Sequence, residues 1–238
     1  MKRITTAAAA AALLCAVAAS AQTSATAGFA PPPPGSVVQN QTVAFNGENA
    51  KNAWHAVISK RLVGSGNGTN FYQWYLSIYG LQRGAYRLRY QSPRNGGPLS
   101  HVEQATGAKM WYPIAQIRIV GAANLMHSGV QQLVVQSHEM GADCGGATVT
   151  IFATQAGGRI GAVAAIKNPC DLGAKLGADG SSVELTGPYY KPDAPMCCPT
   201  KTSATAELRY RNGKWIETPN YFIETPNYFK VQPDGGGP

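Results

Sequence analysis

The sequence DAPMCCPT at residues 193–200 places two adjacent cysteines, Cys197 and Cys198, between prolines. Neighbouring cysteines rarely bond to each other, because a disulfide needs Cα atoms about 4.4–6.8 Å apart and a dihedral angle near 90°. Each of the two therefore favours a separate partner upstream. The sequence predicts that this block ties the end of the chain to its middle.

Two upstream cysteines, Cys144 and Cys170, are the candidate partners. Two of the three pairings that four cysteines allow join them to Cys197 and Cys198, and both pairings stay open. Each closed loop would contribute about 3–4 kcal/mol. A redox or metal site is the competing interpretation, but adjacent cysteines lack the two-residue spacing that such motifs use.

Residues 1–21 have the features of a secretory signal peptide. A basic start precedes an alanine-rich apolar run, and small residues before Gln22 predict cleavage between Ala21 and Gln22. The run is too short and too rich in alanine to span a membrane stably. Cys15 follows a leucine, where a lipoprotein signal needs a small residue, so lipid anchoring is not expected. Export to the periplasm or the medium would let disulfides persist.

The mature chain is predicted to divide into three parts. Residues 22–45 are rich in Pro, Ala and Ser and include four consecutive prolines, which favours an extended linker. Residues 46–231 are long enough to form a globular domain with its own core. Residues 232–238 are expected to be a flexible tail.

Basic residues exceed acidic ones and are unevenly placed. Without the signal peptide the chain has 18 basic and 12 acidic residues, and residues 51–118 hold nine basic residues and one acidic residue. A solvated basic surface is the simpler interpretation. The alternative is an anionic partner in the cell envelope, such as a polymer, a glycan or lipid headgroups. No motif for specific nucleic-acid recognition accompanies the charge.

The clearest alternation lies in residues 71–79. One predicted face carries Tyr72, Trp74, Leu76 and Ile78, and the other carries Phe71, Tyr75 and Tyr79. A turn at residues 80–84 leads back into residues 85–90, in which Arg87 and Arg89 leave the same face.

A hairpin of these two strands suggests a ligand site. If the polar faces coincide, rings and guanidinium groups share one exposed surface, formed by Phe71, Tyr75, Tyr79, Arg87 and Arg89. Such a surface suits an anionic or glycan ligand. A second packed layer without a ligand is the alternative interpretation.

Short apolar runs separated by Gly, Asn, Asp and Pro continue to the end of the chain. They predict a mostly β, antiparallel fold, as a sandwich, meander or barrel stapled by two disulfides. Residues 46–62 are ambiguous, and their spacing favours one short helix over a strand. Residues 121–135 resemble one blade of an FG-GAP-type propeller without its Asp-rich loop, so propeller-like blades are an alternative fold.

The heptapeptide IETPNYF occurs twice in tandem, at residues 216–222 and 223–229. Because seven is odd, one continuous strand would turn the second copy to the opposite face. Pro219 and Pro226 would also interrupt a strand ladder. One copy is therefore predicted to complete the sheet, while the other bulges out or trails as a tail.

One cluster resembles an enzyme site, and it contains His138, Asp143 and Cys144. A cysteine near a histidine can act as a nucleophile, but Cys144 is needed for the disulfide count. The spacing also lacks the His-Glu-x-x-His pattern of zinc proteases. We therefore assign no catalytic residue, metal site or cofactor, and a secreted hydrolase centred on His138 and Asp143 is the rival hypothesis.

The C-terminal region resembles a known family. Residues 182–193 precede the Cys-Cys-Pro-Thr block, and residues 206–214 follow it with an alternating strand and an Asn-Gly-Lys turn. This order is similar to the C-terminal part of the LppP/LprE family of bacterial envelope lipoproteins, although the chain departs from that family at the lipidation signal. The resemblance implies an exported envelope protein and supplies no catalytic residues. We expect a non-catalytic module that binds or scaffolds an anionic or glycan envelope component.

Overall fold

The structure is a computed structural model, and it describes residues 36–49, 52–66, 69–82, 85–92, 102–105, 108–111, 114–139, 146–155, 158–168, 170–191 and 198–222. These residues form no helix. Their strands are β1 (Val37–Asn49), β2 (Asn52–Gly66), β3 (Thr69–Gln82), β4 (Ala85–Gln91), β5 (Val102–Ala105), β6 (Ala108–Trp111), β7 (Ile114–Ala123), β8 (Gln132–Glu139), β9 (Ala147–Thr154), β10 (Ile160–Asn168), β11 (Gly173–Leu176), β12 (Ser182–Tyr189), β13 (Lys201–Arg211) and β14 (Lys214–Thr218).

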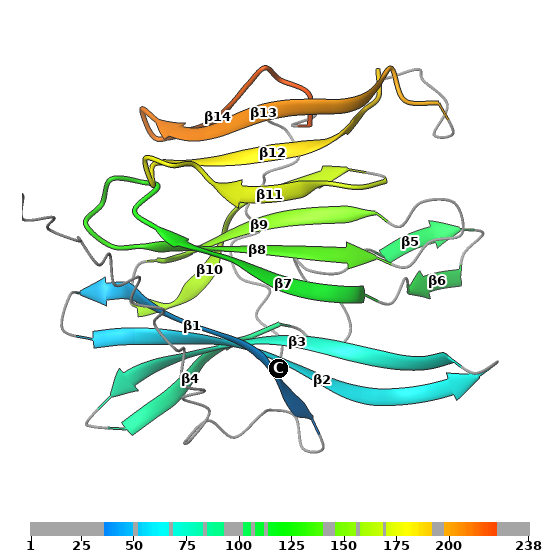
Figure 1. The fold of residues 1–238 in the computed structure, drawn as a ribbon. Coiled ribbons are helices and arrows are strands. Elements are labelled where there is room, and N and C mark those ends of the chain that lie inside the picture. The colour runs from blue at the N-terminus through cyan, green and yellow to red at the C-terminus, as the bar shows by residue number, and fades with distance from the viewer. Residues whose placement is uncertain are drawn as a thin grey trace, which may run out of the picture.

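Three antiparallel sheets stack face to face (Figure 1). The first sheet has the order β1-β2-β3-β4, the middle sheet β10-β9-β8-β7 and the third sheet β11-β12-β13-β14, while β5 and β6 form a separate hairpin. The predicted mostly β, antiparallel sandwich is confirmed, and it has three layers rather than two. The described residues stack as sheets instead of forming a closed barrel or a ring of blades.

The middle sheet is buried on both faces, and its sequence explains why. Strand β9 is apolar or small at every position, and β8 has the apolar run Leu133, Val134 and Val135, so that neither face suits water. In β8, Leu133 and Val135 point toward the first sheet, and Val134 points toward the third. Successive side chains on a strand leave opposite faces, so one strand supplies two cores.

Two hydrophobic cores result. The inner core lies between the first and middle sheets and includes Trp54, Ile58, Leu76, Ile78 and Phe152, each at most 1% exposed. The outer core lies between the middle and third sheets, and its larger buried members are Leu125, Val134, Val149, Ile151, Ile166, Leu172, Val183, Leu185, Leu208 and Phe222. The third sheet alternates regularly: Ala206 and Leu208 are buried, whereas Glu207 and Arg209 face outward.

The helix predicted in residues 46–62 is wrong. These residues form the end of β1 and most of β2, which pair with each other in antiparallel register. The alternating residues Trp54, Ala56 and Ile58 are fully buried on one face, against the middle sheet. Pairing with β1 on one side and β3 on the other overrides the helical spacing, because each neighbour supplies a ladder of hydrogen bonds. Since β1 begins at Val37, residues 37–45 are strand and not linker.

The first copy of the repeated heptapeptide closes the third sheet. Residues 216–218 end β14, which pairs with β13, as the sequence predicted for one copy. The peptide bond between Thr218 and Pro219 is cis, and the chain leaves the ladder there. The second copy, residues 223–229, lies outside the described residues, as do the signal peptide and the tail.

Candidate functional site

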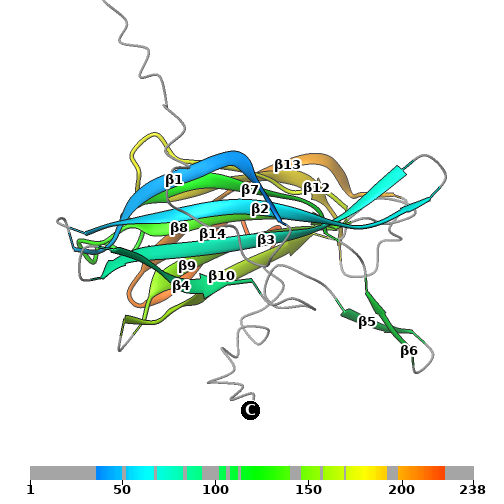
Figure 2. The ribbon, with the colours of Figure 1, turned by 90° about the horizontal axis from the view of Figure 1, so that it is seen from below.

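The β2–β3 hairpin carries basic and aromatic side chains on one surface, near the end at which β2 leads into β3. In Figures 1 and 2 this end reaches beyond the strands of the middle sheet. Ile58 and Leu76 lie beneath the middle sheet and are fully buried. Farther along the same face come four residues that the middle sheet does not fully cover, which we call the Lys60 platform: Lys60, Leu62, Tyr72 and Trp74.

The strand register brings the members of the Lys60 platform together. Lys60 lies directly opposite Trp74, and Leu62 lies opposite Tyr72. The Lys60 ammonium nitrogen is 4.2 Å from the centroid of the Tyr72 ring and 5.3 Å from that of Trp74. Both separations are within the range of cation–π attraction. The two rings therefore hold the ammonium group in place on this face of the hairpin.

The ring contacts do not compensate the positive charge of the Lys60 side chain. A ring attracts a cation through its quadrupole and does not neutralise it. No carboxylate among the described residues forms an ion pair with Lys60. Leu62 is 54% exposed, and Lys60, Tyr72 and Trp74 are half-buried. The Lys60 platform thus offers a positive charge beside accessible apolar surface.

The site predicted on the opposite face is not arranged as expected. Tyr75 is only 1% exposed and Tyr79 only 6%, so neither ring can stack on a ligand without rearrangement. The Tyr75 hydroxyl donates a hydrogen bond of 2.6 Å to the side-chain oxygen of Gln73. Phe71 lies in β3 opposite Gly64, but its side chain is outside the described part of the structure. The second packed layer, weighed as an alternative, describes Tyr75 and Tyr79 better.

The two arginines do not share a face with these tyrosines. Directly opposite residues on paired strands lie on the same face, and Arg87 is opposite Gly80, the neighbour of Tyr79. Arg89 falls at a register shift, between the pairs Ile78–Tyr90 and Tyr79–Leu88. Both arginines are exposed. The register that begins at Gln82–Ala85, beside the turn, thus separates groups that the sequence-based prediction placed together.

The neighbours of these arginines in residues 85–89 of β4 are exposed as well. The Tyr86 hydroxyl lies 2.9 Å from His55 Nε2, and Leu88 is 45% exposed. Arg89 passes over Gly80, because a Cβ atom added there would lie 3.2 Å from Arg89 Cγ and 3.3 Å from the Trp54 ring. Arg89 is therefore positioned by packing at the edge of the inner core, and it forms no ion pair with a carboxylate in the part of the chain that the structure describes.

His138, one member of the rival hydrolase centre, lies near an acidic residue that the sequence analysis did not single out. His138 Nδ1 lies 3.7 Å from the Asp171 carboxylate, and Asp143 is outside the described residues. The Gln136 amide nitrogen lies 2.6 Å from His138 Nε2 and 2.6 Å from the Leu172 carbonyl oxygen. An amide N–H donates, so Nε2 of His138 accepts and Nδ1 carries the proton that points to Asp171.

This polar cluster also contains Arg118. Its guanidinium donates to the Gln136 side-chain oxygen and, over 3.1 Å, to the Ala174 carbonyl oxygen. Gln136 thereby uses both amide hydrogens and its oxygen between the middle and third sheets. Neither ring nitrogen of His138 is left to accept a proton from a nucleophile, which argues for a structural role.

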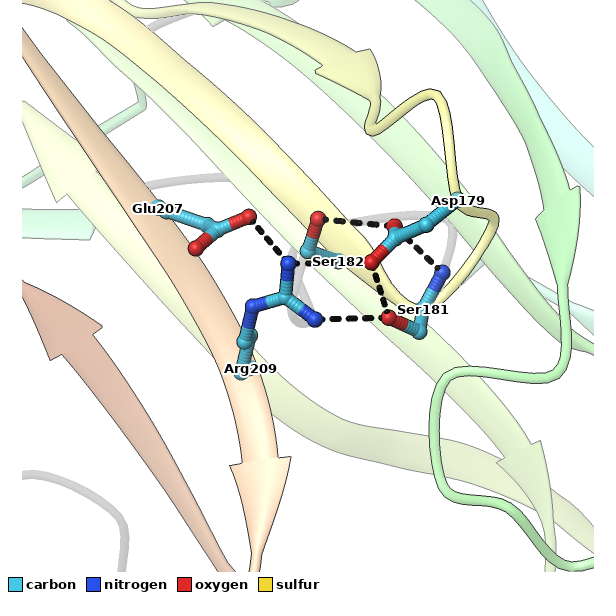
Figure 3. A network of polar contacts seen from close by, with 5 residues as sticks. All are labelled: Asp179, Ser181, Ser182, Glu207 and Arg209. Carbon is cyan, nitrogen blue, oxygen red and sulfur yellow. Dashed lines mark hydrogen bonds and ion pairs between the residues drawn. The ribbon is translucent and has the colours of Figure 1, made fainter.

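A second polar network joins the turn after β11 to β13 (Figure 3). The Arg209 guanidinium contacts Asp179 at 2.9 Å and Glu207 at 2.7 Å, and it donates to Ser181 over 2.7 Å. Hydrogen bonds from Ser181 and then from Arg209 hold the pKa of Asp179 well below its usual range. The bond from Arg209 likewise lowers the pKa of Glu207. Both carboxylates are satisfied within the protein, so this network fixes the turn.

Two of the predicted disulfide cysteines are described. Cys170 is buried and Cys198 is exposed, and the described residues contain no cysteine pair at disulfide distance. Cys144 and Cys197 lie outside the described residues, so the disulfide framework stays a prediction. In the described ranges, no three His, Cys, Asp or Glu side chains are grouped to hold a metal ion. None of the described segments is a helix long and apolar enough to cross a membrane.

Sequence reasoning identified the two faces of β3 but missed the Lys60 platform. The alternation of Tyr72 and Trp74 was visible, whereas the position of Lys60 depended on assigning residues 46–62 to a strand.

Comparison with family models, with curated proteins and with solved structures finds no match to this chain.

Proposed function

We propose that this protein is an exported, non-catalytic binding module that uses the Lys60 platform to hold an anionic glycan or another anionic component of the cell envelope. The observation that carries the proposal is the Lys60 ammonium held at 4.2 Å over the Tyr72 ring, with no carboxylate among the described residues paired to it. The signal-peptide features of residues 1–21 support an envelope location.

The chemistry of the Lys60 platform suits a charged sugar polymer. The ammonium has three donors for a carboxylate or phosphate oxygen. The accessible parts of Leu62, Tyr72 and Trp74 can cover the apolar face of a sugar ring. Nine basic residues against one acidic residue in the segment 51–118 add long-range attraction to an anion. The Lys60 ammonium and the apolar surface beside it would recognise a single charged sugar unit. The surrounding basic residues would attract the anionic polymer at longer range, and this attraction would weaken as salt rises.

The test measures retention of the mature protein on peptidoglycan, on an anionic polysaccharide and on anionic lipid vesicles. We expect Lys60→Gln to weaken binding to its preferred matrix about tenfold, because a hydrogen bond to a charged group is lost. Tyr72→Ala with Trp74→Ala should weaken it further. Binding should also fall between low and high salt, since screening limits the reach of exposed charges to about 10 Å at 0.1 M.

Two controls place the site. Lys214→Gln removes an exposed lysine from the third sheet and should leave retention unchanged. Arg87→Ser with Arg89→Ser tests the strand favoured by the sequence alone. Loss of retention in this double variant, together with normal retention of Lys60→Gln, would move the site to β4 and contradict the proposal.

The hydrolase alternative has a separate test. His138→Ala should abolish a hydrolase centred on His138 and Asp143 but leave retention on an envelope matrix intact. Turnover of any ester, amide or glycoside substrate that disappears in both His138→Ala and Asp143→Ala would favour the hydrolase over a binding module.

We also propose that two disulfides join the loops at one end of the middle and third sheets. The Tyr190 hydroxyl donates to Cys170 Sγ over 2.9 Å, and Lys191 and Thr200 bridge the ends of the loop that carries Cys197. The loop that carries Cys144 is closed by the bond from Glu139 to Gly146. Adding a Cβ atom at Gly146 would bring it within 3.6 Å of the backbone of Asn168, two residues before Cys170. These contacts support neighbouring positions for the cysteine loops.

A further inference from the structure

The first IETPNYF copy, residues 216–222, acts as a latch on the third sheet. Glu217 is 7% exposed, and its carboxylate accepts the backbone N–H groups of Tyr221 and Phe222 at 3.0 and 2.9 Å. This carboxylate turns the chain after the cis bond at Pro219. The turn drives Phe222 into the outer core, where it is 5% exposed.

The surface that receives the latch is preformed by other strands. The Tyr221 ring lies 4.9 Å from the Tyr189 ring of β12, and its hydroxyl accepts a hydrogen bond of 2.7 Å from Lys201 of β13. The Lys201 ammonium is 4.5 Å from the centroid of the Tyr221 ring. We call this surface, together with the outer-core position of Phe222 and the pairing edge of β13, the latch socket.

Residues 223–229 repeat every group that makes these contacts. Glu224 corresponds to Glu217, Tyr228 to Tyr221 and Phe229 to Phe222. The residue before each copy is also aromatic: Trp215 before the first and Phe222 before the second. Trp215 packs edge-on against Tyr210 at 5.2 Å between ring centroids. A shift of the chain by one repeat would therefore place Phe222 against Tyr210 and the second copy against the same socket.

We propose that the latch socket accepts either copy of IETPNYF, so that the chain end has two registers seven residues apart. The first register is favoured because the turn between β13 and β14 is tight. Asn212 and Gly213 have φ angles of 51° and 78°, which is the two-residue geometry that matches the twist of a hairpin. It also keeps Trp215, which buries more apolar area than a phenylalanine.

The second register is accessible because its free-energy cost relative to the first register is small. Residues 212–220 would form a longer connection, and the entropy cost of closing a loop grows only slowly with its length. The latch contacts themselves are reproduced, since the seven residues are identical. We therefore expect the second copy to bind the latch socket, with Phe229 in the position of Phe222, when the first copy is removed or damaged.

The test compares the same substitution in the two copies of the mature full-length chain. Glu217→Lys replaces the acceptor of two backbone N–H groups with a cation, and Glu224→Lys makes the identical change in the second copy. We expect Glu224→Lys to leave the thermal midpoint unchanged. The double variant carries both Glu217→Lys and Glu224→Lys. Glu217→Lys alone should lower the thermal midpoint by less than half as much as the double variant does, because Glu224 can then accept the backbone N–H groups of the second copy. Glu217→Lys in a chain lacking residues 223–229 should match the double variant.

Hydrogen exchange provides the direct readout. In the unmodified chain the backbone amides of Tyr221 and Phe222 should be protected from exchange. In Glu217→Lys the protection should move to the amides of Tyr228 and Phe229. Exposure of the first pair without protection of the second, or equal midpoints for Glu217→Lys and the double variant, would overturn the proposal. Protection at Phe229 that rises with protein concentration would assign the second copy to a neighbouring molecule and would overturn it as well.

Discussion

Tyr79 lies directly opposite Leu88 in the β3–β4 pair. Leu88 is exposed at the edge of the first sheet, while Tyr79 is buried farther in. Both this pair and the Arg87–Gly80 pair belong to the register that begins at Gln82–Ala85 beside the turn, and the shift at Arg89 lies beyond them. The turn therefore decides which side chains of the hairpin share a surface. It places Arg87 and Tyr79 on opposite faces, so the surface predicted from the sequence does not form.

Truncation of Tyr75 should affect stability and not ligand binding alone. Tyr75 is 1% exposed, so Tyr75→Ala should lower the free energy of unfolding by about 3–5 kcal/mol. Leu88→Ala, at a position that is 45% exposed, is the control and should change it by no more than about 0.5 kcal/mol. Urea unfolding followed by tryptophan fluorescence measures both. Weaker retention of a fully stable Tyr75→Ala variant would show that the tyrosine is exposed in solution.

Removal of a buried tyrosine hydroxyl should change stability in opposite directions at Tyr90 and Tyr75. The Tyr90 hydroxyl has no hydrogen-bond partner among the described residues, whereas that of Tyr75 donates to Gln73. Tyr90→Phe should therefore raise the free energy of unfolding by about 1 kcal/mol, because a desolvated polar group disappears. Tyr75→Phe should lower it by about 0.5–1.5 kcal/mol. Destabilisation by Tyr90→Phe would reveal an unseen partner.

Tyr90 should also make stability depend on alkaline pH. Burial raises the pKa of Tyr90 well above its ordinary value. Between the unfolded pKa, about 10, and the raised folded pKa, the unfolded chain ionises while the folded chain keeps its proton. Stability is then lost as pH rises above about 10, and Tyr90→Phe should lose less of it than the unmodified protein.

The Arg209 network should contribute to stability at neutral pH and lose that contribution in acid. The folded-state pKa values of Asp179 and Glu207 are both lowered, so the contribution is complete above the unfolded values, near pH 4. It disappears as pH falls toward the folded values. Arg209→Gln should therefore lower the midpoint temperature of thermal unfolding more at pH 7 than at pH 3. The effect is small because the groups are exposed and screened by solvent.

A matched variant isolates the network from general charge. Arg211→Gln removes an exposed arginine two residues along β13 and should show no such difference between pH 7 and pH 3. The same pH response in both variants would indicate that net charge, and not the contacts of Arg209, controls the acid sensitivity.

The disulfide prediction can be checked by mass mapping of the non-reduced mature protein. Cys144 and Cys170 should each be linked to one member of the Cys197–Cys198 pair. Cys197→Ala should then lower the free energy of unfolding by about 2–5 kcal/mol, the usual range for the loss of a native disulfide. Free thiols at all four positions would remove the framework, and a free Cys144 alone would reopen the question of a cysteine nucleophile.

The sequence by itself determined the β class, the two faces of β3 and the role of one IETPNYF copy. Each depends on local information: alternation with a period of two, turn residues, and prolines that stop a ladder. The apolar runs of β8 and β9 also predicted strands. Their burial on both faces, with a third layer, depended on which sheets cover them.

Only the tertiary structure decided which faces are covered and which residues meet. Residues 46–62 are strands because β1, β2 and β3 pair, although their apolar spacing fits a helix. His138 lies near Asp171 because β8 meets the segment that leads into β11. Alternation assigns side chains to two faces, but register and layer order arise from contacts between distant segments. A bulge such as that at Arg89 has no local signature strong enough to predict.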